Sequence, residues 1–153
     1  MKIGDCMKRS VVSIPLNATI GEAVELLTRH HIGTLPVVDE KGKLVGLLQA
    51  HDLLSLIMPD FVRLVDHFDF VHNFGAVEKR QPTSAELALP VKKVMEAPVF
   101  VEETSGLLRA AALLHHHELR DLPVVDADQH LVGIASHVDI STALMAHWQT
   151  GHS

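Results

Sequence analysis

The alternation of apolar and polar positions in the first third of the chain predicts a strand followed by a helix. Residues 10–14 are rich in β-branched side chains, which is typical of a short strand. Apolar side chains then recur every three or four positions over 20–31. This spacing predicts an amphipathic helix that is capped by Asn17 or Thr19 and ends near Gly33.

Two strands joined by a tight turn are predicted after this helix. Residues 35–38 and 44–48 are almost entirely apolar, and 39–42 read Asp-Glu-Lys-Gly, with a glycine available for a positive φ in a hairpin. The second of these strands is apolar enough to be buried on both faces. A second helix is predicted from Asp52 onward.

The same order of elements returns later because the sequence repeats itself. The twelve residues 35–46 match 122–133 at eight positions, 87 residues further along the chain. The openings of the two copies, at Met7 and Met95, align about one residue out of this offset. A second set of elements is therefore predicted at 99–102, 105–119, 123–125, 131–135 and 139–148.

An insert at 56–90 separates a first repeat at 1–55 from a second repeat at 91–153. It contains four of the five phenylalanines, Phe61, Phe68, Phe70 and Phe74. Their spacing predicts one or two helices, whose aromatic face packs on the chain's own core, on a second copy or on a partner protein. Residues 78–89, which include Pro82 and several charges, are predicted to form a mobile loop.

Charge and composition exclude several classes of partner. The 153 residues carry 19 acidic and 13 basic side chains, and this formal net charge of −6 gives no long-range attraction to a phosphate backbone. No apolar run approaches the ~20 residues that cross a bilayer, and no signal-like segment precedes the single cysteine, Cys6. We therefore expect a cytoplasmic protein that binds neither nucleic acid nor membranes, with Cys6 as a small buried side chain.

A motif at the end of each repeated strand pair carries a family resemblance. Each copy reads apolar-Pro-Val-Val-Asp, then a hairpin, then a glycine followed six positions later by an aspartate, Asp52 or Asp139. This pattern resembles the signature of the cystathionine β-synthase (CBS) domain. The resemblance implies an α+β fold, a Bateman module, in which two strand-helix-strand-strand-helix repeats pack about a pseudo-twofold axis. It also implies two clefts that take adenosine-containing ligands, and a homodimer formed through the helices.

The second copy matches the family motif more fully. Ser136 and Asp139 lie three positions apart where a strand passes into a helix. A carboxylate there can accept hydrogen bonds from ribose hydroxyls, while the serine and the helix N-terminus can donate to an α-phosphate. The family often has a basic residue three positions before the proline of the strand, so Arg120, three positions before Pro123, is our candidate phosphate contact.

The resemblance also implies where the base of such a ligand would lie. It assigns the adenine to apolar walls and to backbone groups near Ala97, Pro98 and Val99. Side-chain identity carries little information at these positions, so the assignment rests on the resemblance alone.

The first copy departs from the family pattern. Gln49 stands where the family carries serine or threonine, and Gly33 stands where the second copy has its arginine, so only Asp52 remains. We therefore predict one competent ligand site and one weak or empty site. Asp52 and Asp139 have an alternative interpretation as helix N-caps, worth about 1 kcal/mol each, and Arg120 has one as an exposed ion pair.

The histidines and the missing motifs bear on catalysis and metals. Several of the 12 histidines cluster at predicted helix ends, at 30–31 and 115–117. Favourable contact with a helix C-terminus explains them without a metal, although metal binding and pH sensing remain alternatives. No glycine-rich phosphate loop or nucleophile elbow is present, so we expect no catalysis and no obligatory cofactor.

Two functions are consistent with these patterns. In the first, AMP, ADP or ATP binds between the repeats, shifts their packing and so regulates an unidentified partner protein. In the second, side chains fill both clefts, no small ligand binds, and the phenylalanine-bearing insert is the functional surface.

Overall fold

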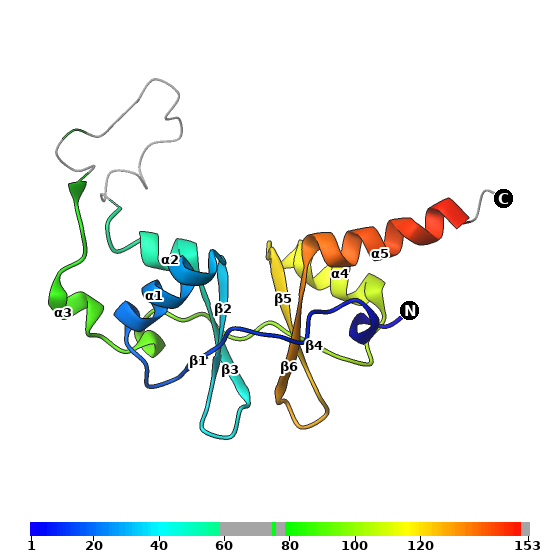
Figure 1. Cartoon of the computed structure of the whole chain (residues 1–153), viewed down its shortest axis with the longest axis horizontal. Coiled ribbons are helices and arrows are strands. Elements are labelled where there is room, and N and C mark those ends of the chain that lie inside the picture. The colour runs from blue at the N-terminus through cyan, green and yellow to red at the C-terminus, as the bar shows by residue number, and fades with distance from the viewer. Residues whose placement is uncertain (59–74, 76–78, 151–153) are drawn as a thin grey trace.

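The structure, a computed structural model that describes residues 1–58, 75 and 79–150, contains two three-stranded sheets. The sheets lie side by side in the middle of the molecule, with helices on their outer sides (Figure 1). The elements in chain order are η1 (Ile3–Asp5), β1 (Ile14–Pro15), α1 (Ile20–His30), β2 (Thr34–Val38), β3 (Leu44–Gln49), α2 (Ala50–Leu54), α3 (Ser84–Leu87), η4 (Val91–Lys93), β4 (Val101–Glu102), α4 (Leu107–His116), β5 (Asp121–Val125), β6 (Leu131–Ser136) and α5 (His137–Thr150). The predicted α+β class and two-repeat architecture are confirmed. None of the helices described is both long and apolar enough to span a bilayer.

The two sheets share one topology and one register. β1 pairs parallel with β2, and β2 pairs antiparallel with β3, in the order β1-β2-β3; the second sheet has the order β4-β5-β6. The pair Val37↔Gly46 in the first sheet recurs as Val124↔Gly133 in the second, and the register shifts one residue later in both. This identity follows from the repeated Leu-Pro-Val-Val-Asp strand and its hairpin, which make the repeats equivalent about a pseudo-twofold axis.

The first helix begins at one of the two predicted caps. The hydroxyl of Thr19 accepts a hydrogen bond from the backbone N–H of Glu22 at 3.2 Å, and the Glu22 carboxylate accepts one from the backbone N–H of Thr19 at 3.3 Å. This reciprocal capping box satisfies backbone donors that the helix itself leaves unpaired. The apolar face of α1 buries Ile20 and Ala23, and the helix ends at His31, whose φ of 52° is left-handed.

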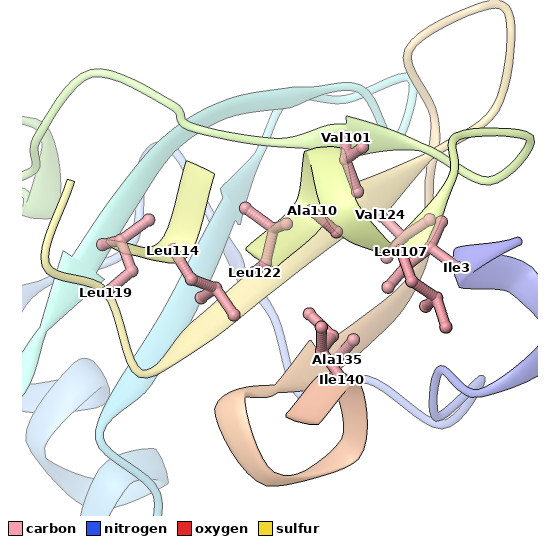
Figure 2. Packing of buried hydrophobic residues seen from close by; sticks show 10 residues of the cluster. All are labelled: Ile3, Val101, Leu107, Ala110, Leu114, Leu119, Leu122, Val124, Ala135 and Ile140. Carbon is pink, nitrogen blue, oxygen red and sulfur yellow. The ribbon is translucent and has the colours of Figure 1, made fainter. Parts of the chain in front are cut away.

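The segment that opens each repeat packs on the other repeat. Ile3 is fully buried in the apolar cluster around Val124 of the second repeat (Figure 2), and its N–H donates to the carbonyl of Ser105 at 2.8 Å. Val91 is buried in the core of the first repeat, and its N–H donates to the carbonyl of Ala18 at 2.8 Å. Packing therefore crosses the boundaries at 55 and 91 that the sequence repeats suggest.

Two strands are shorter than the sequence predicts. β1 holds only Ile14–Pro15, where 10–14 was predicted, and β4 holds only Val101–Glu102, where 99–102 was predicted. Residues 10–13 and 99–100 pair with neither sheet, and the bridges to the opposite repeat are formed further upstream, by Lys8 and Glu96. β-branched composition therefore located both strands but overestimated their length.

The prediction of a mobile loop at 78–89 is wrong for its second half. Residues Ser84–Leu87 form α3, whose first turn is capped by the hydroxyl of Thr83. The carbonyl of Leu89 accepts a hydrogen bond from the N–H of Ile20 at 2.8 Å, which ties this segment to α1. The phenylalanines of the insert, Phe61, Phe68, Phe70 and Phe74, lie outside the described residues, so the helical insert stays a prediction.

Candidate functional site

Each repeat has one junction at which the last strand of its sheet passes into a helix. Junction one is the turn from β3 into α2 and contains Gln49, His51 and Asp52. Junction two is the turn from β6 into α5 and contains Ser136 and Asp139. The family motif therefore brings its polar side chains to the first turn of a helix in both repeats.

The two junctions are anchored to their sheets in the same way. The N–H of Ala50 donates to the carbonyl of Gly33 at 2.9 Å, and the N–H of His137 donates to the carbonyl of Arg120 at 2.7 Å. These contacts fix the backbone of Arg120 beside junction two and leave junction one without a matching side chain. Arg120 is exposed and forms no ion pair within the described part of the chain, so its alternative interpretation as a surface ion pair gains no support.

Ser136 and Asp139 contact each other at junction two. The N–H of Ser136 donates to Oδ2 of Asp139 at 3.0 Å, and the N–H of Asp139 donates to Oγ of Ser136 at 3.0 Å. The expected helix cap is therefore present. It uses one carboxylate oxygen and one lone pair of the hydroxyl, and Oδ1 of Asp139 accepts no hydrogen bond from the described residues. A ligand can still be met by that oxygen and by the serine hydroxyl hydrogen.

The N-terminal segment of the chain lies beside junction two. Lys8 forms an isolated antiparallel bridge with Ile134 of β6, through hydrogen bonds of 2.8 and 2.9 Å. Burial, and then the negative charges of Asp139 and Asp5, raise the pKa of the Cys6 thiol, which places Cys6 near the same carboxylate. Cys6 packs against the second core, as predicted for a small apolar side chain. It is half-buried and not fully buried as predicted.

The linker before β4 lies beside junction one. Glu96 forms the matching bridge with Leu47 of β3, through hydrogen bonds of 3.0 and 2.7 Å. The side-chain amide of Gln49 donates to Oε2 of Glu96 at 2.8 Å, and the N–H of Gln49 donates to Oδ2 of Asp52 at 2.9 Å. Gln49 therefore holds the linker carboxylate at the place where the family would have a small hydroxyl.

Junction one brings the carboxylates of Asp52 and Glu96 close together, with His51 beside them. Burial, and then the hydrogen bond and charge of Glu96, raise the pKa of Asp52 from its usual 3.8 to about 6. His51 Nε2 lies 3.3 Å from Oδ1 of Asp52 and 3.5 Å from Oε2 of Glu96. These three side chains could share one cation, because their ligand atoms lie within 4.8 Å of one another. Asp126, Asp128 and His130 form a second such group in the β5–β6 hairpin.

The structure divides the predicted ligand contacts between the two junctions. Ala97 and Pro98 directly follow Glu96, so they continue from junction one, and Val99 packs against the second core. The grouping of these three residues with Ser136 and Asp139 in one cleft stays a prediction. Sequence reasoning also missed Lys8, Glu96 and His51. The sequence signal for Lys8 and Glu96 was that the openings of the two repeats, at Met7 and Met95, align one residue out of the offset of 87.

A family model decides the family of this fold. The model for the CBS domain matches the chain twice, over residues 3–59 and 91–146. The chain belongs to the CBS domain family. Its two matches coincide with the repeats found in the sequence and in the sheets.

Relatives of this CBS pair occur in plants and bacteria. The chloroplastic CBS domain-containing protein CBSX1 of Arabidopsis thaliana is 34% identical over 152 residues, which cover 94% of this chain and 64% of the relative. This chain thus spans less than two thirds of that protein. YhcV of Bacillus subtilis is 27% identical over 150 residues, which cover 97% of this chain and 89% of the relative. The crystal structure of CBSX2 in complex with AMP matches with a TM-score of 0.70 at 29% identity, over 95% of this chain and 96% of that one.

Two hollows of the CBS pair lie beside α4, and one of them reaches His137 in the turn of junction two. A cavity of about 520 Å³ between α4 and α5 is lined by Ala111, Leu114, His115, Glu118, Leu119, His137, Ile140 and Ser141. Another of about 360 Å³ near the start of α4 includes Phe100 and Arg109 in its lining. Neither is lined by Ser136 or Asp139.

Proposed function

We propose that this CBS pair binds an adenosine nucleotide at junction two and changes the packing of its repeats in response. The observation that carries the proposal is the reciprocal Ser136–Asp139 contact at the start of α5, which leaves a carboxylate oxygen and a hydroxyl hydrogen for a ligand. The relative CBSX2, at 29% identity, was crystallised with AMP. A regulatory binding unit fits the family better than an enzyme.

Each group at junction two has a chemical role in this proposal. Oδ1 of Asp139 accepts hydrogen bonds from the ribose hydroxyls. The serine hydroxyl and the first N–H groups of α5 donate to the α-phosphate, and the helix dipole favours its charge. Arg120 and Lys8 add positive charge at the phosphate end. The adenine would then lie against backbone groups, either those near Ala97, Pro98 and Val99 or those of the N-terminal segment that follows Lys8.

Junction one is proposed as the weaker site for a phosphorylated ligand. It lacks the hydroxyl and the arginine, and Glu96 places a second carboxylate beside Asp52. A phosphate brought there would meet like charge in a partly desolvated setting, where repulsion is poorly screened. One nucleotide per chain is therefore the expected stoichiometry.

Regulation requires that the nucleotide bind one packing arrangement more tightly than another. The arrangement could change within the pair or against a second copy, since α4 and α5 expose the apolar side chains Leu108, Val138 and Trp148. A homodimer through this helical face, a cytoplasmic location and an unidentified regulated partner stay predictions.

The alternative function, an interaction module without a small ligand, has one observation in its favour. The Gln49–Glu96 contact fills the family position of junction one with side chains of the chain itself. The contact does not extend to junction two, which is why nucleotide binding is the preferred proposal.

A calorimetric titration with AMP, ADP, ATP and GMP tests the proposal. The double variant Ser136→Ala/Asp139→Ala should lose at least a hundredfold in AMP affinity, and its counterpart Gln49→Ala/Asp52→Ala should stay within threefold of the native chain. AMP at 100 times its dissociation constant should add about 2.7 kcal/mol, roughly a 5 to 11 °C rise in melting temperature. A flat response to all four nucleotides would favour the interaction module.

A further inference from the structure

Lys8 and Glu96 occupy equivalent places in the two repeats. Lys8 bridges Ile134, and Glu96 bridges Leu47, which is the residue matched to Ile134 at the repeat offset of 87. Both bridges are antiparallel and have two backbone hydrogen bonds. Residues directly opposite in such a pair send their side chains to the same side of the sheet. The side chain of Lys8 therefore lies on the junction-two side of its sheet, in the same way that the side chain of Glu96 lies on the junction-one side.

The matched positions differ in charge. Each matched pair is given with the junction-one residue first: Glu96 and Lys8, Gln49 and Ser136, His51 and Val138, Asp52 and Asp139, and Gly33 and Arg120. Junction one thus has two carboxylates with His51 between them and no lysine or arginine. Junction two has a lysine and an arginine with Asp139 and a second carboxylate, Asp121, which is the strand partner of Ser136 and stands where the first repeat has Thr34. Only the ribose-binding aspartate is common to both.

We propose that Lys8 and Glu96 are specificity-determining residues that sort adenosine ligands by charge. Junction two takes compounds with an anionic 5′ substituent, and junction one takes compounds with a cationic 5′ substituent, of which a sulfonium is the simplest. The inference rests on the proposed function, because it assumes that both junctions hold an adenosine moiety through Asp52 or Asp139.

The Glu96 side chain is 42% exposed and is held on one side by a hydrogen bond. Its Oε2 accepts a hydrogen bond from the Gln49 amide at 2.8 Å, and the Gln49 side chain is buried. Asp52 lies on its other side, and burial, followed by the hydrogen bond and charge of Glu96, raises the pKa of Asp52 to about 6. A cationic group at this place relieves the repulsion between the two carboxylates, whereas a phosphate increases it.

The ligand pair S-adenosylmethionine and S-adenosylhomocysteine isolates the charge. The two compounds differ by one methyl group and by the positive charge on sulfur. In a partly buried site a unit charge at contact distance changes affinity on the order of tenfold or more. We expect the native chain to bind the sulfonium compound at least tenfold more tightly than the thioether, with a preference that falls as salt is added.

Two variants of the full chain assign that preference to its residues. Glu96→Gln should abolish the preference for the sulfonium and leave AMP affinity within twofold. Lys8→Gln should weaken AMP at least tenfold and leave the sulfonium compound within twofold. Glu40→Gln and Lys92→Gln, which remove exposed charges outside the junctions, are the matched controls and should change neither ligand. All affinities are measured by calorimetry, with the melting temperature of each variant as the test of folding.

The outcomes separate this inference from the proposed function. If AMP binds through Asp139 but the native chain treats the sulfonium and the thioether alike, charge sorting is overturned and the proposed function stands. Equal losses of both ligands in both variants also overturn it. Binding of Zn²⁺ or Mn²⁺ that depends on Glu96, without any sulfonium preference, replaces the organic cation by a metal and overturns the assigned ligand class. Failure of every adenosine compound to bind overturns both proposals.

Discussion

Junctions one and two share a backbone and differ in almost every side chain. Both have an aspartate that accepts from the N–H three residues earlier, at 2.9 Å for Asp52 and 3.0 Å for Asp139. In junction two the position of that N–H donor is a serine that caps α5, whereas in junction one it is Gln49, whose amide donates to Glu96. The helix that follows has 14 residues in junction two and five in junction one. The difference teaches that the shared residues maintain the fold, while the divergent ones are free to set what each junction binds.

The largest effects on stability are expected from the opening segments, which are exchanged between the two repeats. Ile3 completes the core of the second repeat and Val91 that of the first, and both are fully buried. Ile3→Ala should lower the free energy of unfolding by about 2 to 4 kcal/mol, and Val91→Ala by somewhat less, because each leaves a cavity. Urea denaturation measures both, with Leu108→Ala at an exposed site as the control, expected within about 0.5 kcal/mol of the native chain. An Ile3→Ala variant as stable as that control would contradict the packing of residue 3 on the second repeat.

A matched glycine pair tests how closely those segments approach the sheets. A Cβ at Gly133 would lie 2.9 Å from the carbonyl oxygen of Lys8, and one at Gly46 would lie 3.2 Å from that of Glu96. Both would also press on a methionine sulfur, Met7 or Met95. We expect Gly133→Ala to destabilise by about 2 kcal/mol and Gly46→Ala by about 1 kcal/mol, because overpacking costs more where a backbone atom must move.

The two glycine variants also have a functional consequence. Gly133→Ala should weaken AMP binding, since it displaces Lys8, and Gly46→Ala should not. Thermal denaturation and calorimetry measure the two effects on the same samples. The reverse order of nucleotide affinities would show that the N-terminal segment does not serve junction two.

The smallest expected effect concerns the charge at junction one. The pKa of Asp52 is raised from 3.8 to about 6 in the folded chain, so between these values the folded state binds more protons than the unfolded state. The free energy of unfolding therefore falls as pH rises from about 4 to about 6 and stays lowered above that. Asp52→Asn, which keeps an acceptor for the N–H of Gln49, should be more stable than the native chain by about 1 kcal/mol at pH 7.5, after allowance for the exposure of Glu96.

The pH dependence of that gain is what checks its origin. Denaturation at pH 4.5, 5.5, 6.5 and 7.5 should show the advantage of Asp52→Asn shrinking toward zero at the acid end. The groups that face Asp52 are Glu96 and His51, so the same substitution in a Glu96→Gln background should gain less. A gain that is constant with pH, or larger in acid, would contradict the carboxylate pair.

Much of the fold could be predicted from local pattern. The strand pairs, the hairpins, the Thr19 cap and the first helix of each repeat followed from apolar spacing and turn residues. Ser136 and Asp139 were found because a three-residue separation at a strand-to-helix boundary brings side chains together whatever the rest of the chain does. Repetition added confidence to each element, since both copies give the same register.

The errors came from segments whose partners are distant in sequence. Residues 10–14 were assigned to a strand, yet only Ile14 of that range pairs with β2. Neither periodicity nor composition states which sheet an extended segment joins, because isolated bridges such as Lys8↔Ile134 obey no local rule. The mobile loop was expected from proline and charge alone, and the contact of Leu89 with Ile20 overrode that composition.

The sequence by itself determined the family, the two repeats and the contents of each strand-to-helix junction, because these depend on contacts within a few residues. Only the tertiary structure decided that the opening segments cross between repeats, and hence that Lys8 pairs with Ile134 of β6 while Glu96 lies beside Asp52. The physical reason is that each repeat is too small to bury its core alone. It is completed by a segment of the other repeat, and that segment carries its charge to the neighbouring junction.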